Sequence, residues 1–438
     1  MSKRKEASAS LTPVRGWNSY DCYGCAINEA QFRANAEAMA VKLLPHGYTY
    51  ACMDALWYYD DVTPTQLGAT STREPHLDAF GRPVPSPLRF PSSADGKGFK
   101  PLADAVHRLG LKFGLHIMRG IPRLAVERRL PVARSRRKAP AIANQASRCS
   151  WENTMFGVDM GKAGAQAWYD SLLELYAGWG VDLIKADDFG NTPYHREEVA
   201  ALHRAVKNCG RPVRLSLSPG IMAHEMMTAH PHVAEHSDLW RISADIWDKW
   251  NDVRYLFPLC AFWSGAIGPA SFPDADMLPY GMMGLGNKPT LPTRKSRLTA
   301  DEVRTHFTLL AIARSPLLFG GDIPQLDDFT LAILTNPEVL AINSRSRGNR
   351  PLWLWPRDDR YVAWTAEAEA GPEKYLAVFN LGDEPAEISV DLAEHGFGAR
   401  VRLRDLWARA DLGTAAKTFA PRLAPHACAL VSCQTIEK

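Results

Sequence analysis

The sequence lacks several features that would assign a chain to a class at once. Its 438 residues contain no apolar run near the ~20 residues that a membrane-spanning helix needs. The first ten residues are rich in Lys, Arg and Ser and have no apolar core, unlike a secretory signal. A large excess of one charge is also missing, since the formal net charge is only +3. We therefore expect no nucleic acid and no membrane as partners, and a cytoplasmic location unless a signal peptide has been removed.

Cysteine is sparse and poorly arranged for a disulfide or zinc framework. Of the eight cysteines, only Cys22 and Cys25 form a C-x₂-C pair, and no second pair or histidine follows at zinc-ligand spacing. We expect mostly free thiols in a reducing compartment, and neither a metal nor a cofactor. The number of subunits stays open, a homo-oligomer included.

What is present is the composition of an ordinary globular protein. Hydrophobic residues make up 46% of the chain and charged residues 23%. The 13 tryptophans suit either stacking on sugar rings or filling a core. The composition therefore allows a large core and permits carbohydrate binding without proving it.

Short apolar runs alternate with amphipathic stretches over most of the chain, which favours parallel β/α units. Eight such units predict a (β/α)₈ (TIM) barrel. After about residue 347, closely spaced short apolar runs with turn signals predict an antiparallel β-sandwich. We expect a disordered segment over 1–13, a catalytic barrel over 14–346 and a sandwich domain over 347–438. The barrel strands are expected at 14–17, 48–54, 112–117, 181–187, 213–217, 239–243, near 266–267 and near 316–319.

Polar residues follow the carboxyl ends of the expected barrel strands, and active sites of such barrels lie at these ends. Six or more carboxylates converge there, which exceeds what helix capping explains. Carboxylates could hold a hard metal ion. Lys185 and Arg241 would repel an ion but would suit a glycosidase, which uses two carboxyl groups and ionised side chains that bind hydroxyls. The basic stretch 123–140 follows strand 3; we expect a solvated loop there, with an anionic substrate as the alternative.

Eight motifs in order resemble the α-galactosidase (melibiase) family, glycoside hydrolase family 27. They include Gly16-Trp17-Asn18-Ser19-Tyr20, Met53-Asp54-Ala55-Leu56-Trp57, Gly114-Leu115-His116, Lys185-Ala186-Asp187, Trp240-Arg241-Ile242-Ser243-Ala244-Asp245 and Pro273-Asp274-Ala275-Asp276. The resemblance spans the barrel and extends to the C-terminal β-domain. It implies a retaining exo-α-glycosidase without a cofactor, acting on an oligosaccharide or glycoside.

The resemblance also implies roles at matching positions. Asp187 corresponds to the nucleophile and Asp245 to the general acid/base. Sugar-binding roles are implied for Trp17, Asp54, Lys185 and Arg241. We add Trp57, His116, Ser218 and Asp276 as candidate substrate-binding residues. The alternatives are structural: Trp57 as a core residue, His116 as a buried histidine, and Asp276 as a residue that orders its loop.

Some positions depart from the family pattern, so the sugar is less certain than the chemistry. Ala55 replaces the second of two adjacent aspartates, His116 replaces a tyrosine, and strand 5 ends in Ser218 instead of an acidic residue. We expect an α-galactosidase first. The alternatives are the same chemistry on an α-glucoside, an α-N-acetylgalactosaminide or a β-L-arabinopyranoside, or a non-catalytic carbohydrate-binding protein.

Overall fold

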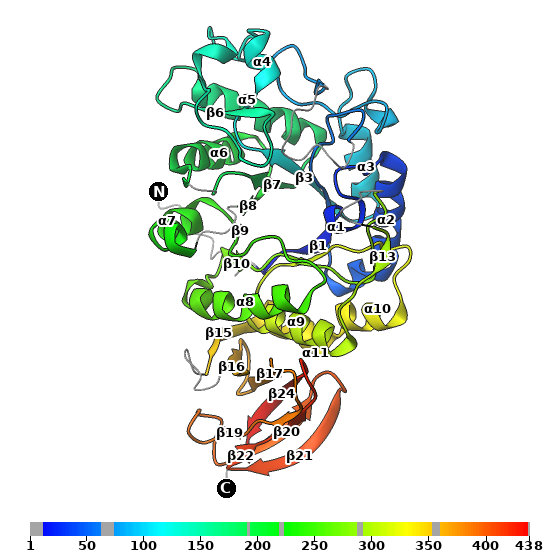
Figure 1. The fold of residues 1–438 in the computed structure, drawn as a ribbon, viewed down its shortest axis with the longest axis vertical. Helices are drawn as coiled ribbons and strands as arrows, with labels where there is room; N and C mark the ends of the chain where they lie inside the picture. The colour runs from blue at the N-terminus through cyan, green and yellow to red at the C-terminus, as the bar shows by residue number, and fades with distance from the viewer. Residues whose placement is uncertain are drawn as a thin grey trace, which may run out of the picture.

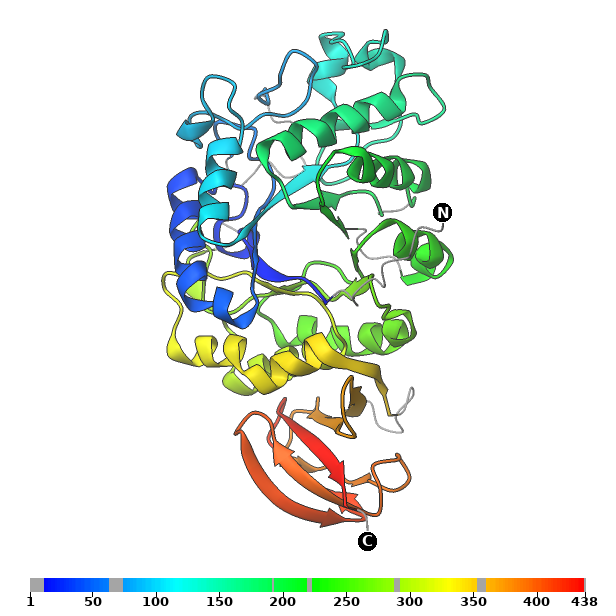
Figure 2. The same ribbon diagram turned by 180° about the vertical axis from the view of Figure 1, so that it is seen from behind.

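The computed structural model describes residues 12–62, 74–190, 193–218, 223–286, 292–352 and 360–436, without the side chains of 223–227. Residues 1–11, most of the segment expected to be disordered, lie outside the described residues. Eight parallel strand positions form a ring enclosed by helices, and a group of antiparallel strands lies at one end of the long axis (Figures 1 and 2). The structure thus has the predicted TIM-like barrel and C-terminal β-sandwich.

The barrel strands follow one another around the ring in chain order. They are β1 (Arg15–Asn18), β2 (Tyr50–Met53), β3 (Lys112–Met118), β7 (Leu183–Asp187), β8 (Arg214–Ser218), β9 (Leu239–Arg241), β10 (Phe272–Asp274), β11 (Met277–Leu278) and β14 (Leu317–Phe319). β10 pairs with β9, and β11 pairs with β14. Only two residues separate β10 from β11, so residues 272–278 act as one closing segment. This segment pairs with β9 on one side and with β14 on the other, and it thereby closes the ring.

This closing segment corrects one prediction. The seventh strand was expected near residues 266–267, but Ser264–Ala266 form a short 3₁₀ helix and the strand begins at Phe272. The closing segment contains Pro273 and two aspartates, a composition that does not predict a strand. Its strand form depends on pairing with the neighbours on both sides.

Helices cover the outside of the ring. Those between successive barrel strands are α2 (Glu29–Lys42), α3 (Lys100–Arg108), α5 (Ala165–Trp179), α6 (Arg196–Asn208), α7 (Ala223–His236), α8 (Trp250–Trp263) and α9 (Ala300–Ile312), followed by α10 (Asp328–Thr335) and α11 (Pro337–Arg345). Asn28 and Thr299 begin α2 and α9 with capping boxes, which satisfy the free N–H groups of the first turn. Among the described residues, no helix combines the length and hydropathy that crossing a membrane requires.

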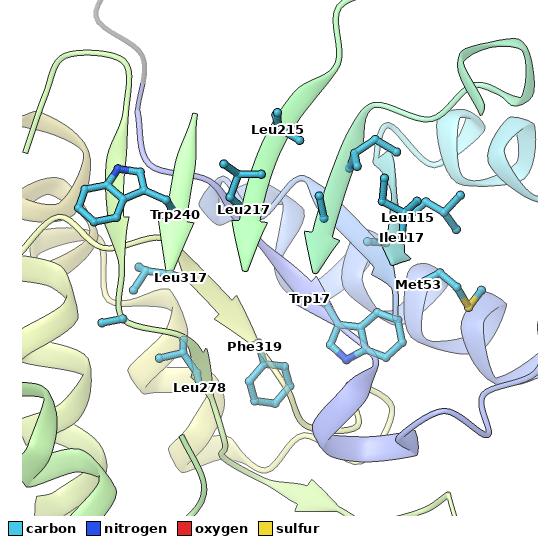
Figure 3. Packing of buried hydrophobic residues seen from close by; sticks show 14 of the residues in the cluster. Trp17, Met53, Leu115, Ile117, Leu215, Leu217, Trp240, Leu278, Leu317 and Phe319 are labelled. Atoms are coloured by element: carbon cyan, nitrogen blue, oxygen red, sulfur yellow. The ribbon is translucent and has the colours of Figure 1, made fainter. Parts of the chain in front are cut away.

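Side chains alternate between the two faces of each barrel strand. Figure 3 shows outward residues, including Leu115, Ile117, Leu215, Leu217 and Trp240, in the core between strands and helices. The intervening residues form a small apolar layer inside the ring, to which Cys52, Leu183 and Leu239 belong. The inward positions nearer the carboxyl ends of the strands are mostly polar, and they form the floor of the site.

An excursion between β3 and α5 carries the basic stretch 123–140. It contains β4 (Ile121–Pro122), α4 (Arg123–Glu127), β5 (Ala143–Asn144) and β6 (Met155–Val158). Two of its arginines form ion pairs, Arg128 with Glu74 and Arg134 with Glu174 of α5. Arg134 thus lies against the outer helix layer, which does not favour the anionic-substrate alternative.

The C-terminal sheet has the order β15 (Ser346–Pro351), β16 (Tyr361–Ala368), β17 (Lys374–Asn380), β24 (Cys428–Thr435), β20 (Arg400–Asp405) and β21 (Ala410–Ala416). Two short pairs oppose it: β18 (Ala386–Glu387) with β23 (Arg422–Leu423), and β19 (Val390–Asp391) with β22 (Thr418–Phe419). The sequence also favours a strand over the apolar run at 352–355, of which 353–355 lie outside the described residues. We propose to divide the chain at the junction of α11 and β15, next to the expected boundary.

Candidate active site

The described carboxyl ends of the barrel strands converge on one group of polar side chains. On β7, Lys185 and Asp187 are inward positions, two residues apart. Asp187 is the register partner of Met118 on β3 and of Ser218 on β8. Paired residues of neighbouring strands project to the same side of a sheet, so Ser218 lies beside Asp187 at the barrel mouth.

The ammonium group of Lys185 is bound to a carboxylate from another strand. Its Nζ lies 2.7 Å from Asp54 Oδ2, which also accepts a hydrogen bond from Asn18 Nδ2 at 2.8 Å. Burial alone would raise the pKa of Asp54, but the charges of Lys185 and His116 and these hydrogen bonds hold it well below its ordinary value. Asp54 is therefore an ionised acceptor fixed at the floor of the site.

Asp187 is held by two donors. His116 Nε2 lies 3.2 Å from Asp187 Oδ2, and the backbone N–H of Asp188 donates to Asp187 Oδ1 at 2.8 Å. His116 is 1% exposed and the Asp187 side chain 22% exposed, so the carboxylate faces the opening while the imidazole lies beneath it. This arrangement leaves one side of the Asp187 carboxylate accessible to a substrate.

A buried ion network supports the end of β7. Arg119 donates to Asp188 Oδ2 at 3.0 Å and to Glu198 Oε1 at 2.7 Å, and Tyr169 donates to Glu198 Oε2 at 2.6 Å. Asp188 has a positive φ of 68°, which costs energy for a residue with a side chain. The network thus holds the strained residue that follows Asp187. All eight cysteines are free thiols, so no disulfide contributes to this support.

Arg241 connects Asp245 with the closing segment. Arg241 Nη2 donates to Asp245 Oδ1 at 3.1 Å, and its Nη1 lies 3.0 Å from Asp276 Oδ1. The Asp245 side chain is 66% exposed, whereas those of Arg241 and Asp276 are 6% and 7% exposed. Asp245 therefore stands at the rim of the site and Asp276 at its floor.

Two predicted sugar-binding residues lie elsewhere. Trp17 is fully buried, packs against Phe32 of α2 and donates from Nε1 to the Gly321 carbonyl at 2.8 Å. Trp57 is also fully buried, and its Nε1 donates to the His116 carbonyl at 2.8 Å. On β1 the outward position of Trp17 leaves the neighbouring Asn18 facing inward. Neither indole can contact a sugar in this structure, so both are corrected to core residues.

Sequence reasoning missed two aromatic residues of the mouth, Tyr20 and Trp247. Tyr20 lies near Trp247, with ring centroids 6.3 Å apart. The pKa of Tyr20 is raised well above its ordinary value, first by burial and then by nearby charges that include Asp54, Asp245 and Asp187. The phenol therefore lies among the three carboxylates. Its place two residues beyond the inward Asn18 was the signal available in the sequence.

The chemistry of this site fits a glycosidase better than a metal centre. No group of three metal-ligating side chains with suitable geometry occurs among the residues that the structure describes. Asp187 lies at the end of β7 beside His116, and Asp245 lies in the loop after β9 beside Arg241. The cations Lys185 and Arg241 are mostly buried and lie in the same mouth. A TIM-like barrel with such a mouth is typical of a glycoside hydrolase.

Comparison with known proteins supports this class. A family model described as alpha galactosidase A matches residues 153–345, and one described as the alpha galactosidase C-terminal beta sandwich domain matches residues 358–432. The α-galactosidase of Cyamopsis tetragonoloba is 27% identical over 439 residues, which cover 97% of this chain and 86% of that protein.

Solved structures give higher similarity. A GH27 β-L-arabinopyranosidase from Geobacillus stearothermophilus is 41% identical, with a TM-score of 0.91, over 97% of this chain and 96% of that one. An aspartate-to-alanine variant of that enzyme, 40% identical to this chain, was solved with arabinose. A protein from Bacillus halodurans C-125, provisionally assigned as an α-N-acetylgalactosaminidase, is 40% identical, with a TM-score of 0.86 over 97% of each chain. This chain belongs to the GH27 α-galactosidase (melibiase) family of glycoside hydrolases, so its substrates are carbohydrates.

Proposed function

We propose that this chain is a retaining β-L-arabinopyranosidase, with Asp187 as nucleophile and Asp245 as general acid/base. The observation that carries the proposal is the similarity to the GH27 β-L-arabinopyranosidase, at 41% identity over 97% of the chain. The α-galactosidases in the comparison are less similar, at 27% identity for the example above. The alternative left open by the sequence is therefore better supported than α-galactosidase activity.

Ala55 gives a physical reason for this preference. β-L-Arabinopyranose has the ring configuration of α-D-galactose but lacks its C6 hydroxymethyl group. Ala55 is 3% exposed and offers no side-chain hydrogen bond where the family often has a second aspartate. A buried hydroxyl without a partner is costly, so an apolar wall favours the sugar that lacks the extra hydroxyl.

In the proposed first step, the Asp245 carboxylic acid protonates the glycosidic oxygen while an Asp187 oxygen attacks the anomeric carbon. The carbon–oxygen bond to the leaving group breaks, and a covalent glycosyl-Asp187 ester forms. Asp245 then removes a proton from water, which displaces Asp187 and releases the sugar with retained configuration. We expect the two carboxyl groups to lie about 5–5.5 Å apart, the retaining separation.

Four further residues complete the proposed sugar site. Asp54 accepts from sugar hydroxyls, whereas Lys185 and Arg241 donate to them. Buried Arg241 Nε and His116 Nδ1 have no hydrogen-bond partner among the described residues, which makes them candidate donors or acceptors for a hydroxyl.

Ser218 favours a second candidate, α-N-acetylgalactosaminidase. Its short side chain lies beside Asp187, where the family pattern has an acidic residue, and the smaller group leaves volume for a 2-acetamido substituent. The similarity to the Bacillus halodurans protein points to the same sugar.

A panel of p-nitrophenyl glycosides tests these assignments. It comprises the β-L-arabinopyranoside, α-D-galactopyranoside, α-N-acetylgalactosaminide and α-D-glucopyranoside. We expect kcat/KM to be at least about 10-fold higher for the arabinopyranoside than for the galactopyranoside. NMR of the first-formed anomer should show retention. Preference for the galactoside or the acetamido sugar would replace the proposed substrate, and inversion would overturn the mechanism. Turnover of no glycoside would favour a carbohydrate-binding role.

A further inference from the structure

Arg241 is placed between two carboxylates of different exposure. One end of its guanidinium lies 3.1 Å from an oxygen of Asp245, and the other lies 3.0 Å from an oxygen of Asp276. Asp245 is exposed at the rim, while Asp276 is almost fully buried behind the arginine. A single cation thus joins the proposed acid/base to a carboxylate deeper in the barrel.

The contact between Arg241 and Asp245 creates a chemical difficulty. A positive charge within hydrogen-bond distance stabilises a carboxylate and opposes its protonation. A general acid must instead hold a proton until the leaving group departs. An arginine whose charge acted on Asp245 alone would therefore weaken the first half of the proposed reaction.

Asp276 is built into the barrel so that it faces Arg241. Its Oδ2 accepts the backbone N–H of Ile246 at 2.7 Å, and its own N–H donates to Asp274 Oδ1 at 2.9 Å. Its φ of 75° lies in the left-handed region, which residues with side chains adopt at a cost. These restraints come from both the Asp245 loop and the closing segment, so they fix the carboxylate relative to both.

The charged groups near Asp276 come from several segments of the barrel mouth. Arg241 and Lys185 are the cations, and Asp245, Asp274 and Asp21 are the acids. Burial, with help from Asp245 and Asp274, raises the pKa of Asp276 above its ordinary value, although Arg241 and Lys185 oppose this. The pKa values of Asp274 and Asp21 are also raised, in both cases mainly by burial. Burial therefore destabilises the ionised form of these carboxyl groups. Arg241 is the main opposing charge at Asp276 and Asp274, and Lys185 is the opposing charge at Asp21.

We propose that Asp276 is a positioning residue that neutralises Arg241 and thereby lets Asp245 keep its proton for the leaving group. Asp276 acts through its contacts with Arg241 and with the backbone N–H of Ile246. This positioning role differs from the substrate-binding role first expected for Asp276, and it rests on the proposed role of Asp245.

The variant Asp276→Asn tests this role, because the amide keeps the shape and an acceptor for Ile246 but removes the charge. The basic limb of the pH profile of kcat/KM, where Asp245 loses its proton, should move to lower pH by about half a unit or more. At a pH on that basic limb, a half-unit shift should cost a phenyl glycoside about 3-fold in kcat/KM. A 2,4-dinitrophenyl glycoside, which needs little protonation, should lose much less.

Asp248→Asn is the matched control. Asp248 lies in the loop that carries Asp245, its side chain is fully buried, and it is paired with Arg294 and Arg297 rather than with Arg241. This control should leave the basic limb where it is. If Asp276→Asn does not fold, Asp276→Ser, which also removes the charge, should show the same shift.

The inference is overturned if the basic limb of Asp276→Asn stays at the pH of the parent enzyme and the variant loses the same factor of kcat/KM with the phenyl and the dinitrophenyl glycoside. Asp245→Ala separates this failure from failure of the proposed function. If Asp245→Ala abolishes the basic limb while Asp276→Asn leaves it at the parent pH, only the role of Asp276 is overturned. An Asp245→Ala variant that keeps the parent limb and leaving-group dependence overturns the assignment of Asp245 itself.

Discussion

Lys185 Nζ lies 2.7 Å from Asp54 Oδ2, which joins two residues 131 positions apart at the floor of the barrel. Their side chains are 14% and 3% exposed, so water screens the pair weakly. Removing one partner leaves a buried charge without its counter-ion, which costs several kcal/mol. The pair therefore behaves as a unit in binding and in stability.

We expect Asp54→Ala and Lys185→Met each to lower kcat/KM for the preferred glycoside by about 100-fold or more. The double variant should lose much less than the product of the two, because the second change removes a charge that the first left unpaired. Lys112→Met, at the opposite end of β3, is the control and should retain parent activity. Strictly multiplicative losses would show that the two residues act independently.

The two proposed catalytic carboxylates should respond differently to azide. Asp245→Ala keeps its nucleophile, so a dinitrophenyl glycoside should still glycosylate Asp187 and then stall without a base. Azide needs no base, and it should restore turnover and give a glycosyl azide of retained configuration. Asp187→Ala should give at most the inverted azide, identified by NMR. The opposite stereochemical outcomes would exchange the two roles.

Ala55 should control discrimination between arabinopyranosides and galactosides. Ala55→Asp restores the family's second aspartate beside Asp54 and offers a partner to the C6 hydroxyl. The ratio of kcat/KM for the galactoside to that for the arabinopyranoside should rise by about 10-fold. Ala55→Leu, which adds volume without a polar group, should not raise the ratio. An unchanged ratio in Ala55→Asp would show that the end of β2 does not select the sugar.

His306 should make the fold sensitive to acid. It is fully buried, its Nδ1 lies 2.9 Å from Tyr280 Oη, and burial lowers its pKa to about 3. An unfolded histidine binds a proton near pH 6.5, so the unfolded chain holds the extra proton between these values. Stability is therefore complete above about pH 6.5 and falls as the pH decreases toward 3.

The substitution His306→Gln tests this contribution by urea denaturation across pH 4.5–7.5. The variant should be less stable than the parent at pH 7.5, because packing and the contact with Tyr280 are disturbed. Its free energy of unfolding should then fall less steeply with decreasing pH than that of the parent. Parallel pH dependences would show that another group causes the acid sensitivity.

Much of the fold was predictable because its signals are local. The strand ending in Asp187 and the helix after it carry their periodicity in consecutive residues, and strands of a barrel bring their carboxyl ends together. Asp54, Lys185 and Arg241 were therefore expected at one site before any contact was known. The family motifs added the expected roles of Asp187 and Asp245, which stay predictions until variants are measured.

The sequence by itself determined the barrel, the sandwich and the group of strand ends that carry charged residues. Only the tertiary structure decided which side chains meet. It turned Trp17 outward toward α2, closed the ring with β10 and β11, and set Asp276 against Arg241. The alternation of side chains along a strand does not say which of its two faces points into the barrel. That face is fixed only when the strand pairs, in one register, with strands that are distant in the sequence. The charge balance around Asp245 likewise exists only once three separate segments have been brought together.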